Sequence, residues 1–147
     1  MKLLGPSEGG KRLWLDDERP PPPDYDYWVK TADECIEALD SGLYSHVSLD
    51  HDLAAEHYHG DLPAKEAYKE KTGMAVVDWM VEHEKIPWSI RIHTMNPVGR
   101  KNMANALRAF LERNQDEGHV RAPFNPRVEI RVYDYRVDLS PDLRRPT

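Results

Sequence analysis

Residues 46–52 read His46-Val47-Ser48-Leu49-Asp50-His51-Asp52, a short apolar run that ends in an acid, a histidine and a second acid. Brief apolar runs are typical of buried strands in parallel sheets, and open α/β sheets bind ligands just beyond the carboxyl ends of their strands. The runs 13–17 and 90–96 end in polar residues in the same way. If the three strands are parallel neighbours, one edge of the sheet carries a set of polar side chains: Asp16, Asp17, Asp50, Asp52, His93, Thr94 and Asn96.

The first connection of the predicted sheet lacks the pattern of a helix. A strand is predicted over 11–16, and four consecutive prolines, 20–23, follow it. Proline has no backbone N–H and cannot continue through a normal helix interior. We therefore expect an extended proline-rich loop where most α/β proteins place their first helix, followed by a short second strand over 27–30.

Helix and strand patterns alternate through the rest of the chain. Thr31 and Glu34 have the spacing of a capping box, which predicts a helix that ends at Gly42. Thr72 can cap a second helix that runs until Pro87.

A third helix is expected from Asn96-Pro97, which suit the N-cap and the first helical position. The remaining strands are predicted over 46–50, 88–94 and 128–132. This alternation predicts an α/β fold, a three-layer, doubly wound, five-stranded parallel sheet.

The length of 147 residues favours one domain. We expect residues 1–10 to form a flexible lead, 11–139 a single α/β domain and 140–147 a polar tail. The charged segment 53–71 has no strand period, and whether it forms a lid over the site stays open.

Composition narrows the possible surroundings and partners of the chain. It has no apolar run approaching about 18 residues, so we expect no membrane span. A single cysteine, Cys35, fits a reducing cytoplasm. The balance of 20 basic and 26 acidic residues gives a net charge of −6, which argues against binding long duplex DNA. A small phosphate group or a nucleic-acid end bound through a metal remains compatible.

Two acidic pairs suggest a metal site. Asp16 with Asp17 and Asp50 with Asp52 would crowd carboxylates at one sheet edge, where they repel each other unless a cation neutralises them. An all-oxygen site favours Mg²⁺ or Mn²⁺. The alternative is that these aspartates cap turns after their strands.

The stretch His93 to Lys101 suggests a phosphate site. A helix N-terminus offers free backbone N–H groups and the positive end of the helix dipole. Groups that could bind a phosphoryl oxygen there belong to Thr94, Asn96, Arg100 and Lys101. His93 could act as an acid or base near neutral pH. The alternative is a well-capped helix beside a packed histidine.

Four ordered blocks of the chain resemble the cyclic-phosphate-processing receiver-like domains, divergent relatives of response-regulator receivers. The blocks are LWLDDERPPPP (13–23), VSLDHDL (47–53), Thr72-Gly73 and HTMNPVGRKNM (93–103), and the resemblance covers about residues 11–135. It implies a sheet of order 2-1-3-4-5.

The resemblance also implies roles for individual residues. Asp16 and Asp17 match the acidic pair that holds magnesium, Asp50 the phosphoacceptor, and Thr94 approximately the hydroxyl position. The prolines after the first strand, the His-Asp after Asp50 and the residues around Thr94 depart from ordinary receivers, and this disfavours signalling phosphotransfer.

Three hypotheses follow for the function. The first is a metal-dependent phosphoesterase that acts on a small cyclic nucleotide or on a 2′,3′-cyclic phosphate RNA end, as in RNA repair. Asp50 would hold the metal or attack the phosphorus, and His93 or His51 would protonate the leaving oxygen. The second is a receiver-like switch phosphorylated at Asp50, or a module that sequesters a nucleotide. The third is an interaction domain without activity.

Overall fold

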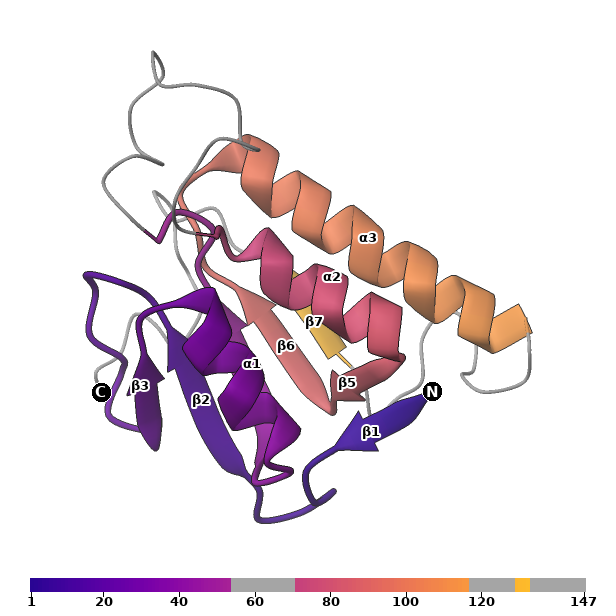
Figure 1. The fold of residues 1–147 in the computed structure, drawn as a ribbon, viewed down its shortest axis with the longest axis horizontal. Coiled ribbons are helices and arrows are strands. Elements are labelled where there is room, and N and C mark those ends of the chain that lie inside the picture. The colour runs from indigo at the N-terminus through magenta and orange to yellow at the C-terminus, as the bar shows by residue number, and fades with distance from the viewer. Residues whose placement is uncertain (54–70, 117–128, 133–147) are drawn as a thin grey trace.

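A five-stranded parallel sheet forms the centre of the chain (Figure 1). The structure, a computed structural model, describes residues 1–53, 71–116 and 129–132. The strands of the sheet are β2 (Lys11–Leu15), β3 (Tyr27–Val29), β4 (Tyr44–Leu49), β6 (Ser89–Ile92) and β7 (Glu129–Val132). Their order is β3-β2-β4-β6-β7. This is the predicted order 2-1-3-4-5, so the α/β receiver-like topology is confirmed.

Three helices lie together over one face of this sheet (Figure 1). They are α1 (Ala32–Asp40), α2 (Met74–His83) and α3 (Pro97–Asp116). Their buried side chains join those of the strands in one apolar core, with Leu39, Met80 and Leu107 among them. The described residues thus make the sheet and one helical layer of the three layers expected.

The connection between β2 and β3 is an extended loop without a helix, as the prolines predicted. It returns along the face of the sheet that α1, α2 and α3 leave uncovered. The Trp14 indole N–H donates to the carbonyl of Arg19 at 2.7 Å, and the Trp14 and Tyr25 rings meet edge to face with centroids 5.1 Å apart. Aromatic packing by the loop thus takes the place of a first helix.

The N-terminus of α1 follows the predicted capping box. The Thr31 hydroxyl accepts from the Glu34 backbone N–H at 3.1 Å, and the Glu34 carboxylate accepts from the Thr31 backbone N–H at 3.2 Å. Gly42, at φ +81°, follows the end of this helix.

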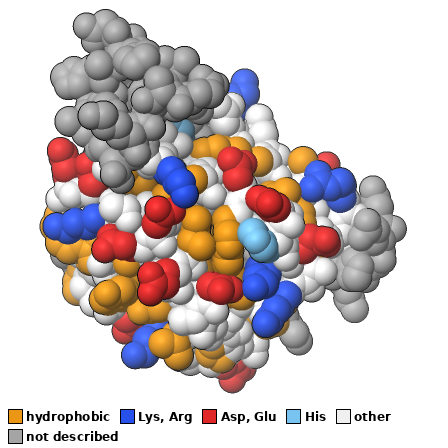
Figure 2. Space-filling view, viewed as in Figure 1, with side chains coloured by type: hydrophobic (Ala, Val, Ile, Leu, Met, Phe, Trp, Pro, Cys, Tyr) orange, Lys and Arg blue, Asp and Glu red, His pale blue; other side chains and the backbone are white. Residues whose placement is uncertain are grey.

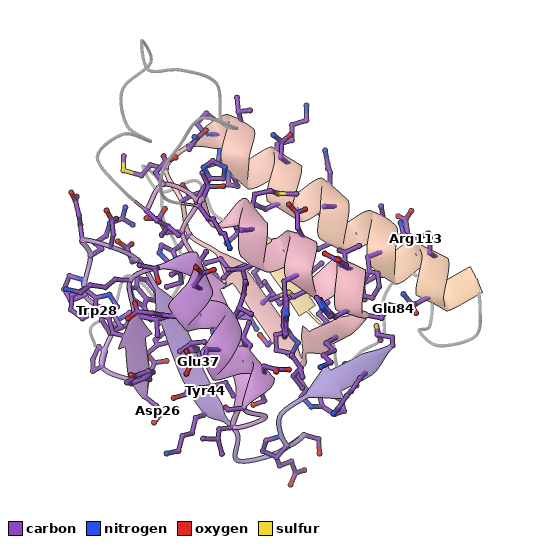
Figure 3. All side chains as sticks on the ribbon, viewed as in Figure 1. Asp26, Trp28, Glu37, Tyr44, Glu84 and Arg113 are labelled. Carbon is purple, nitrogen blue, oxygen red and sulfur yellow. The ribbon has the colours of Figure 1, made fainter. Side chains whose placement is uncertain are left out.

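The bounds of α2 differ from those predicted. Gly73 is its N-cap, and Thr72 instead accepts from the Met74 N–H at 3.3 Å. At its other end, Glu84 adopts a left-handed conformation at φ 53° and stops the helix before Pro87. Glu84 and Arg113, labelled in Figure 3, mark the ends of α2 and α3 that lie away from the carboxyl ends of the strands.

The expectation of a flexible lead over residues 1–10 is wrong for its first part. Strand β1 (Lys2–Leu4) pairs in parallel with β5 (Lys85–Pro87), a strand that was not predicted either. Leu4 and Ile86 are both buried, so apolar side chains anchor the pair to the core. Two three-residue strands show no period in a sequence, which is why they were missed.

Several sequence expectations lie outside the described residues. They concern the possible lid, the loop before β7 and the polar tail 140–147. In the part of the chain that is described, no helix is long and apolar enough to cross a bilayer.

Candidate metal and phosphate site

The carboxyl ends of β2, β4 and β6 meet at one edge of the sheet. Leu15 pairs with Leu49 and Leu49 with Ile92, so the residue after each strand arrives at the same level. These residues are Asp16, Asp50 and His93, and they are 1%, 2% and 0% exposed. One ligand atom from each lies within 4.8 Å of the others. The structure therefore brings together three of the predicted site residues in a buried cluster.

The Asp16 carboxylate is held by donors on both oxygens. Its Oδ1 accepts from the backbone N–H groups of Glu18 and Arg19 at 2.9 and 2.8 Å, and its Oδ2 lies 3.0 Å from His93 Nε2. Burial acts to raise the pKa of Asp16, but the contacts to His93 and to the two N–H groups outweigh it, and the pKa is lowered. Asp16 is thus a fixed, ionised carboxylate. Trp28, labelled in Figure 3, donates to the Asp16 carbonyl at 2.6 Å and fixes the backbone there.

The surroundings of Asp50 disfavour its charged form, whereas those of Asp16 favour it. Its Oδ1 accepts from the His51 backbone N–H at 2.8 Å, whereas its buried Oδ2 has no hydrogen-bond partner in the described structure. Burial, followed by the negative charge of Asp16, raises the pKa of Asp50 to about 7, against the lowering effects of Arg19, the His51 N–H and the Thr94 hydroxyl. A buried acceptor without a donor, beside a second carboxylate, is the environment that a divalent cation satisfies. Asp16 and Asp50 therefore fit a metal.

His93 has both ring nitrogens engaged. Nε2 faces Asp16, and Nδ1 lies 2.7 Å from the Ser48 hydroxyl. The Trp14 ring stacks on the imidazole at 4.0 Å between centroids and an interplanar angle of 5°. Burial lowers the pKa of His93 although Asp16 opposes this, so the imidazole is neutral at neutral pH. The geometry assigns His93 to holding Asp16, and the acid–base role expected for it stays a prediction.

His51 and Asp52 form a second polar pair. His51 Nδ1 lies 2.8 Å from Asp52 Oδ1, and the buried Nε2 has no hydrogen-bond partner among the described residues. Asn96 adds a donor to Asp52 at 3.3 Å. Gly99 packs against the imidazole, where an added Cβ would lie 2.5 Å from the ring. A carboxylate-oriented histidine whose second nitrogen makes no hydrogen bond is a suitable arrangement for a general acid or base.

The predicted phosphate-binding residues lie at the start of α3. The Asn96 side-chain oxygen accepts from the N–H groups of Val98 and Gly99 at 3.1 and 3.0 Å, so it caps the helix and occupies two of its donors. The Arg100 guanidinium donates to the Thr94 carbonyl at 3.3 Å.

The remaining predicted site residues vary in exposure. Thr94 is buried and its hydroxyl accepts from the Asn96 N–H at 3.1 Å, while Lys101 is exposed. Asp17 is half-buried, and neither it nor Asp52 belongs to the close cluster. Phosphate binding by the start of α3 and metal binding by Asp17 and Asp52 stay predictions.

Sequence reasoning missed three supporting residues. Ser48 orients His93, and Arg19 lies 3.7 Å from Asp16 as an ion pair. Gly73 donates its N–H to the His51 carbonyl at 2.8 Å and lies so close to the Asp50 carbonyl that a side chain would collide with it. The period of two along β4 could have revealed Ser48, because it places Ser48 on the face opposite Val47 and Leu49.

The fold and the buried cluster at the strand ends define a receiver-like α/β domain. Its family is given by the model of the cyclic-phosphate processing receiver domain, which matches residues 11–109, and the chain belongs to this family. No curated protein and no solved structure matches the chain significantly.

Proposed function

We propose that this protein is a metal-dependent phosphoesterase that hydrolyses a cyclic phosphate. The observation that carries the proposal is the buried pair of Asp16 and Asp50, in which Asp50 Oδ2 lacks a partner. This pair lies where a parallel sheet binds ligands, in a family associated with cyclic-phosphate processing.

Asp16 and Asp50 would hold Mg²⁺ or Mn²⁺, with Asp17 following Asp16 as a further candidate ligand and Asp52 as a more distant one. Such a cation, when bound, polarises a phosphoryl oxygen and lowers the pKa of water. The two carboxylates would fix the position of the cation, and thereby of the phosphate, at the edge of the sheet. Whether Asp50 instead attacks the phosphorus as a nucleophile is an alternative that substitution tests.

Opening a cyclic phosphate requires a proton for the leaving oxygen and a base for the attacking water. We assign the acid–base role to His51, because Asp52 holds its Nδ1 and leaves Nε2 without a partner. His93, the other candidate, has both ring nitrogens engaged by Asp16 and Ser48. His93 would act on the reaction through the metal site, where it contacts Asp16.

The start of α3 would bind the phosphoryl oxygens. Thr94 lies at the strand end beside Asp50, and Arg100 and Lys101 bring positive charge into the first turns of the helix. Asn96 would orient Asp52 and cap the helix, while the positive charge that binds the phosphoryl group would come from Arg100 and Lys101. Hydrogen bonds to the phosphoryl group gain strength as negative charge builds in the transition state.

The substrate we propose is a small cyclic nucleotide or a 2′,3′-cyclic phosphate RNA end in the cytoplasm, where opening such ends would be a step of RNA repair. Acidic and basic side chains are interspersed with apolar ones over the face seen in Figure 2. Together with the net charge of −6, this supports a short ligand over long duplex DNA or a membrane surface.

The experiment is incubation of the full chain with Mg²⁺ or Mn²⁺ and a panel of 2′,3′-cyclic mononucleotides, cyclic dinucleotides and cyclic-phosphate-ended RNA, followed by mass analysis. We expect one substrate to gain a water. The gain should disappear with EDTA and in D16N, and persist in D40N, which removes an exposed carboxylate on α1.

Two outcomes would redirect the proposal. A D50N variant with full turnover excludes Asp50 as the nucleophile. Recovery of every substrate unchanged overturns the phosphoesterase, and phosphorylation of Asp50 by a small phosphodonor would then favour the receiver-like switch.

A further inference from the structure

We propose that Nε2 of His93 is a direct metal ligand beside the carboxylates of Asp16 and Asp50, and that the site therefore selects Mn²⁺ over Mg²⁺. This inference rests on the metal site of the proposed function and not on hydrolysis. It adds a nitrogen to a site that the sequence describes with oxygen ligands alone.

The spacing of the three side chains fits a shared cation. Their ligand atoms all lie within 4.8 Å of one another, and His93 Nε2 lies 3.0 Å from Asp16 Oδ2. Two neighbouring ligands of an octahedral cation, each about 2.1 Å from it, lie about 3.0 Å apart. The distance of 3.0 Å between His93 Nε2 and Asp16 Oδ2 therefore suits a hydrogen bond when no metal is bound and two neighbouring ligands when a metal is bound. Asp50 Oδ2, buried and without a partner, supplies the third atom.

The surroundings of His93 hold its ring in one orientation. Ser48 contacts Nδ1 at 2.7 Å, and Trp14 stacks on the ring with an interplanar angle of 5°. Metal-binding histidines almost always use their second nitrogen in this way, and the outer partner fixes the tautomer. Ser48 and Trp14 therefore leave Nε2 directed at the two carboxylates.

Metal binding requires a proton to change place on this ring. Without metal, His93 donates Nε2–H to Asp16. With metal, the proton resides on Nδ1 and is donated to the Ser48 hydroxyl, which can rotate to accept it. The ring carries one proton in both arrangements, and its move to Nδ1 frees the lone pair of Nε2.

The donor set determines which cation is preferred. Mg²⁺ favours oxygen ligands and retains its water, whereas imidazole suits transition-metal cations. Two carboxylates with one imidazole combine both kinds of donor. Mn²⁺ accepts carboxylate oxygen as readily as Mg²⁺ and gains more from the nitrogen.

The test is pulsed electron paramagnetic resonance of Mn²⁺ bound to the full chain. We expect a ¹⁴N coupling from a directly bound imidazole in the wild type, and its loss in H93Q. We also expect H93Q to weaken Mn²⁺ binding by roughly tenfold or more, measured by calorimetry, with a smaller effect on Mg²⁺. H83Q is the matched control, because His83 is an exposed histidine at the end of α2, and its spectrum should equal that of the wild type.

A second measurement needs no substitution, in case H93Q does not fold. Labelling all seven histidines with ¹⁵N should replace the ¹⁴N pattern by that of ¹⁵N.

A further variant, S48A, tests the contact that positions His93. The nitrogen coupling should persist in this variant while its Mn²⁺ affinity falls.

The inference is overturned by Mn²⁺ that binds without nitrogen coupling, by coupling that persists in H93Q, or by the absence of Mn²⁺ binding. Failure of hydrolysis with the coupling intact would overturn the proposed function alone.

Discussion

At the scale of single residues, Asp16 and Asp50 differ although both end buried strands. Asp16 receives two backbone N–H groups and the His93 contact, so its pKa is lowered. Asp50 is buried and faces the charge of Asp16, and its single backbone N–H does not compensate, so its pKa is raised to about 7. One carboxylate is thus ionised in advance, and the other becomes a good ligand only when a cation compensates its charge.

This difference predicts how stability depends on pH. Without divalent cations, folding raises the pKa of Asp50 from 3.8 to about 7, so the folded protein keeps a proton that the unfolded chain releases. The free energy of unfolding should therefore fall as pH rises from about 4 to about 7. D50N lacks this titration and should be more stable than the wild type at pH 8 by on the order of 2–4 kcal/mol, but not at pH 4.

Urea denaturation of both proteins in EDTA across this range measures the difference. Added Mn²⁺ should reduce it at pH 8, because the cation stabilises the ionised carboxylate of the wild type. Parallel pH profiles for the two proteins would contradict the assignment of this titration to Asp50.

At the scale of elements, the start of α3 links helix stability to the site. Asn96 caps the helix through its side-chain oxygen and contacts Asp52 through its amide nitrogen. Asp52 in turn orients His51. A single cap residue thus connects the third helix to the proposed acid–base pair.

We expect N96A to lower the free energy of unfolding by about 1 kcal/mol and to lower turnover by roughly tenfold, a part of what a general acid supplies. T31A is the matched control, because Thr31 caps α1 in the same way without contacting Asp52. It should lower stability by a similar amount and leave turnover unchanged. Equal losses of turnover in both variants would show that the effect comes from stability alone.

Elements also show what the sequence can predict. The five strands of the large sheet and the three helices are predictable from the sequence because their apolar residues form recognisable runs or periods. The helices α1 and α3 also begin at recognisable caps, Thr31 and Asn96. Strands β1 and β5 are not predictable because three residues carry no period, and the N-cap of α2 is Gly73, one residue after the expected Thr72.

The candidate site was predictable to the same extent. Asp16, Asp50 and His93 each follow a strand, and topology alone brings them together. Contacts such as Ser48 with His93 depend on register and on which face of a strand a residue occupies. Only interatomic distances show that Nε2 of His51 lacks a hydrogen-bond partner among the described residues, whereas both ring nitrogens of His93 have one.

At the scale of the whole molecule, the small sheet of β1 and β5 contributes to stability at a distance from the site. Leu4 is buried against the core, and Trp88 donates to the Gly5 carbonyl at 3.0 Å. Neither contact involves Asp16, Asp50 or His93. Substitutions in this small sheet should therefore lower the free energy of unfolding without changing metal affinity.

We expect L4A to lower the free energy of unfolding by about 2–3 kcal/mol and to leave Mn²⁺ affinity unchanged. L43A removes an exposed leucine of the same size and should change neither quantity. Denaturation and calorimetry on the folded variants measure both. A loss of Mn²⁺ affinity in L4A under conditions where it is fully folded would show that the small sheet supports the site.

The hydrogen bond from Gly73 to His51 bears on how such a protein can diversify. It joins the backbone on the two sides of residues 52–72 at 2.8 Å, so the ends of this segment are held together beside the site. The entropic cost of closing a connection between fixed ends grows only slowly with its length, by about 0.6 kcal/mol for each doubling. Changes in the number of residues between Leu53 and Lys71 should therefore cost the fold little free energy, so ligand preference could diversify there while Asp16, Asp50 and His93 keep their positions.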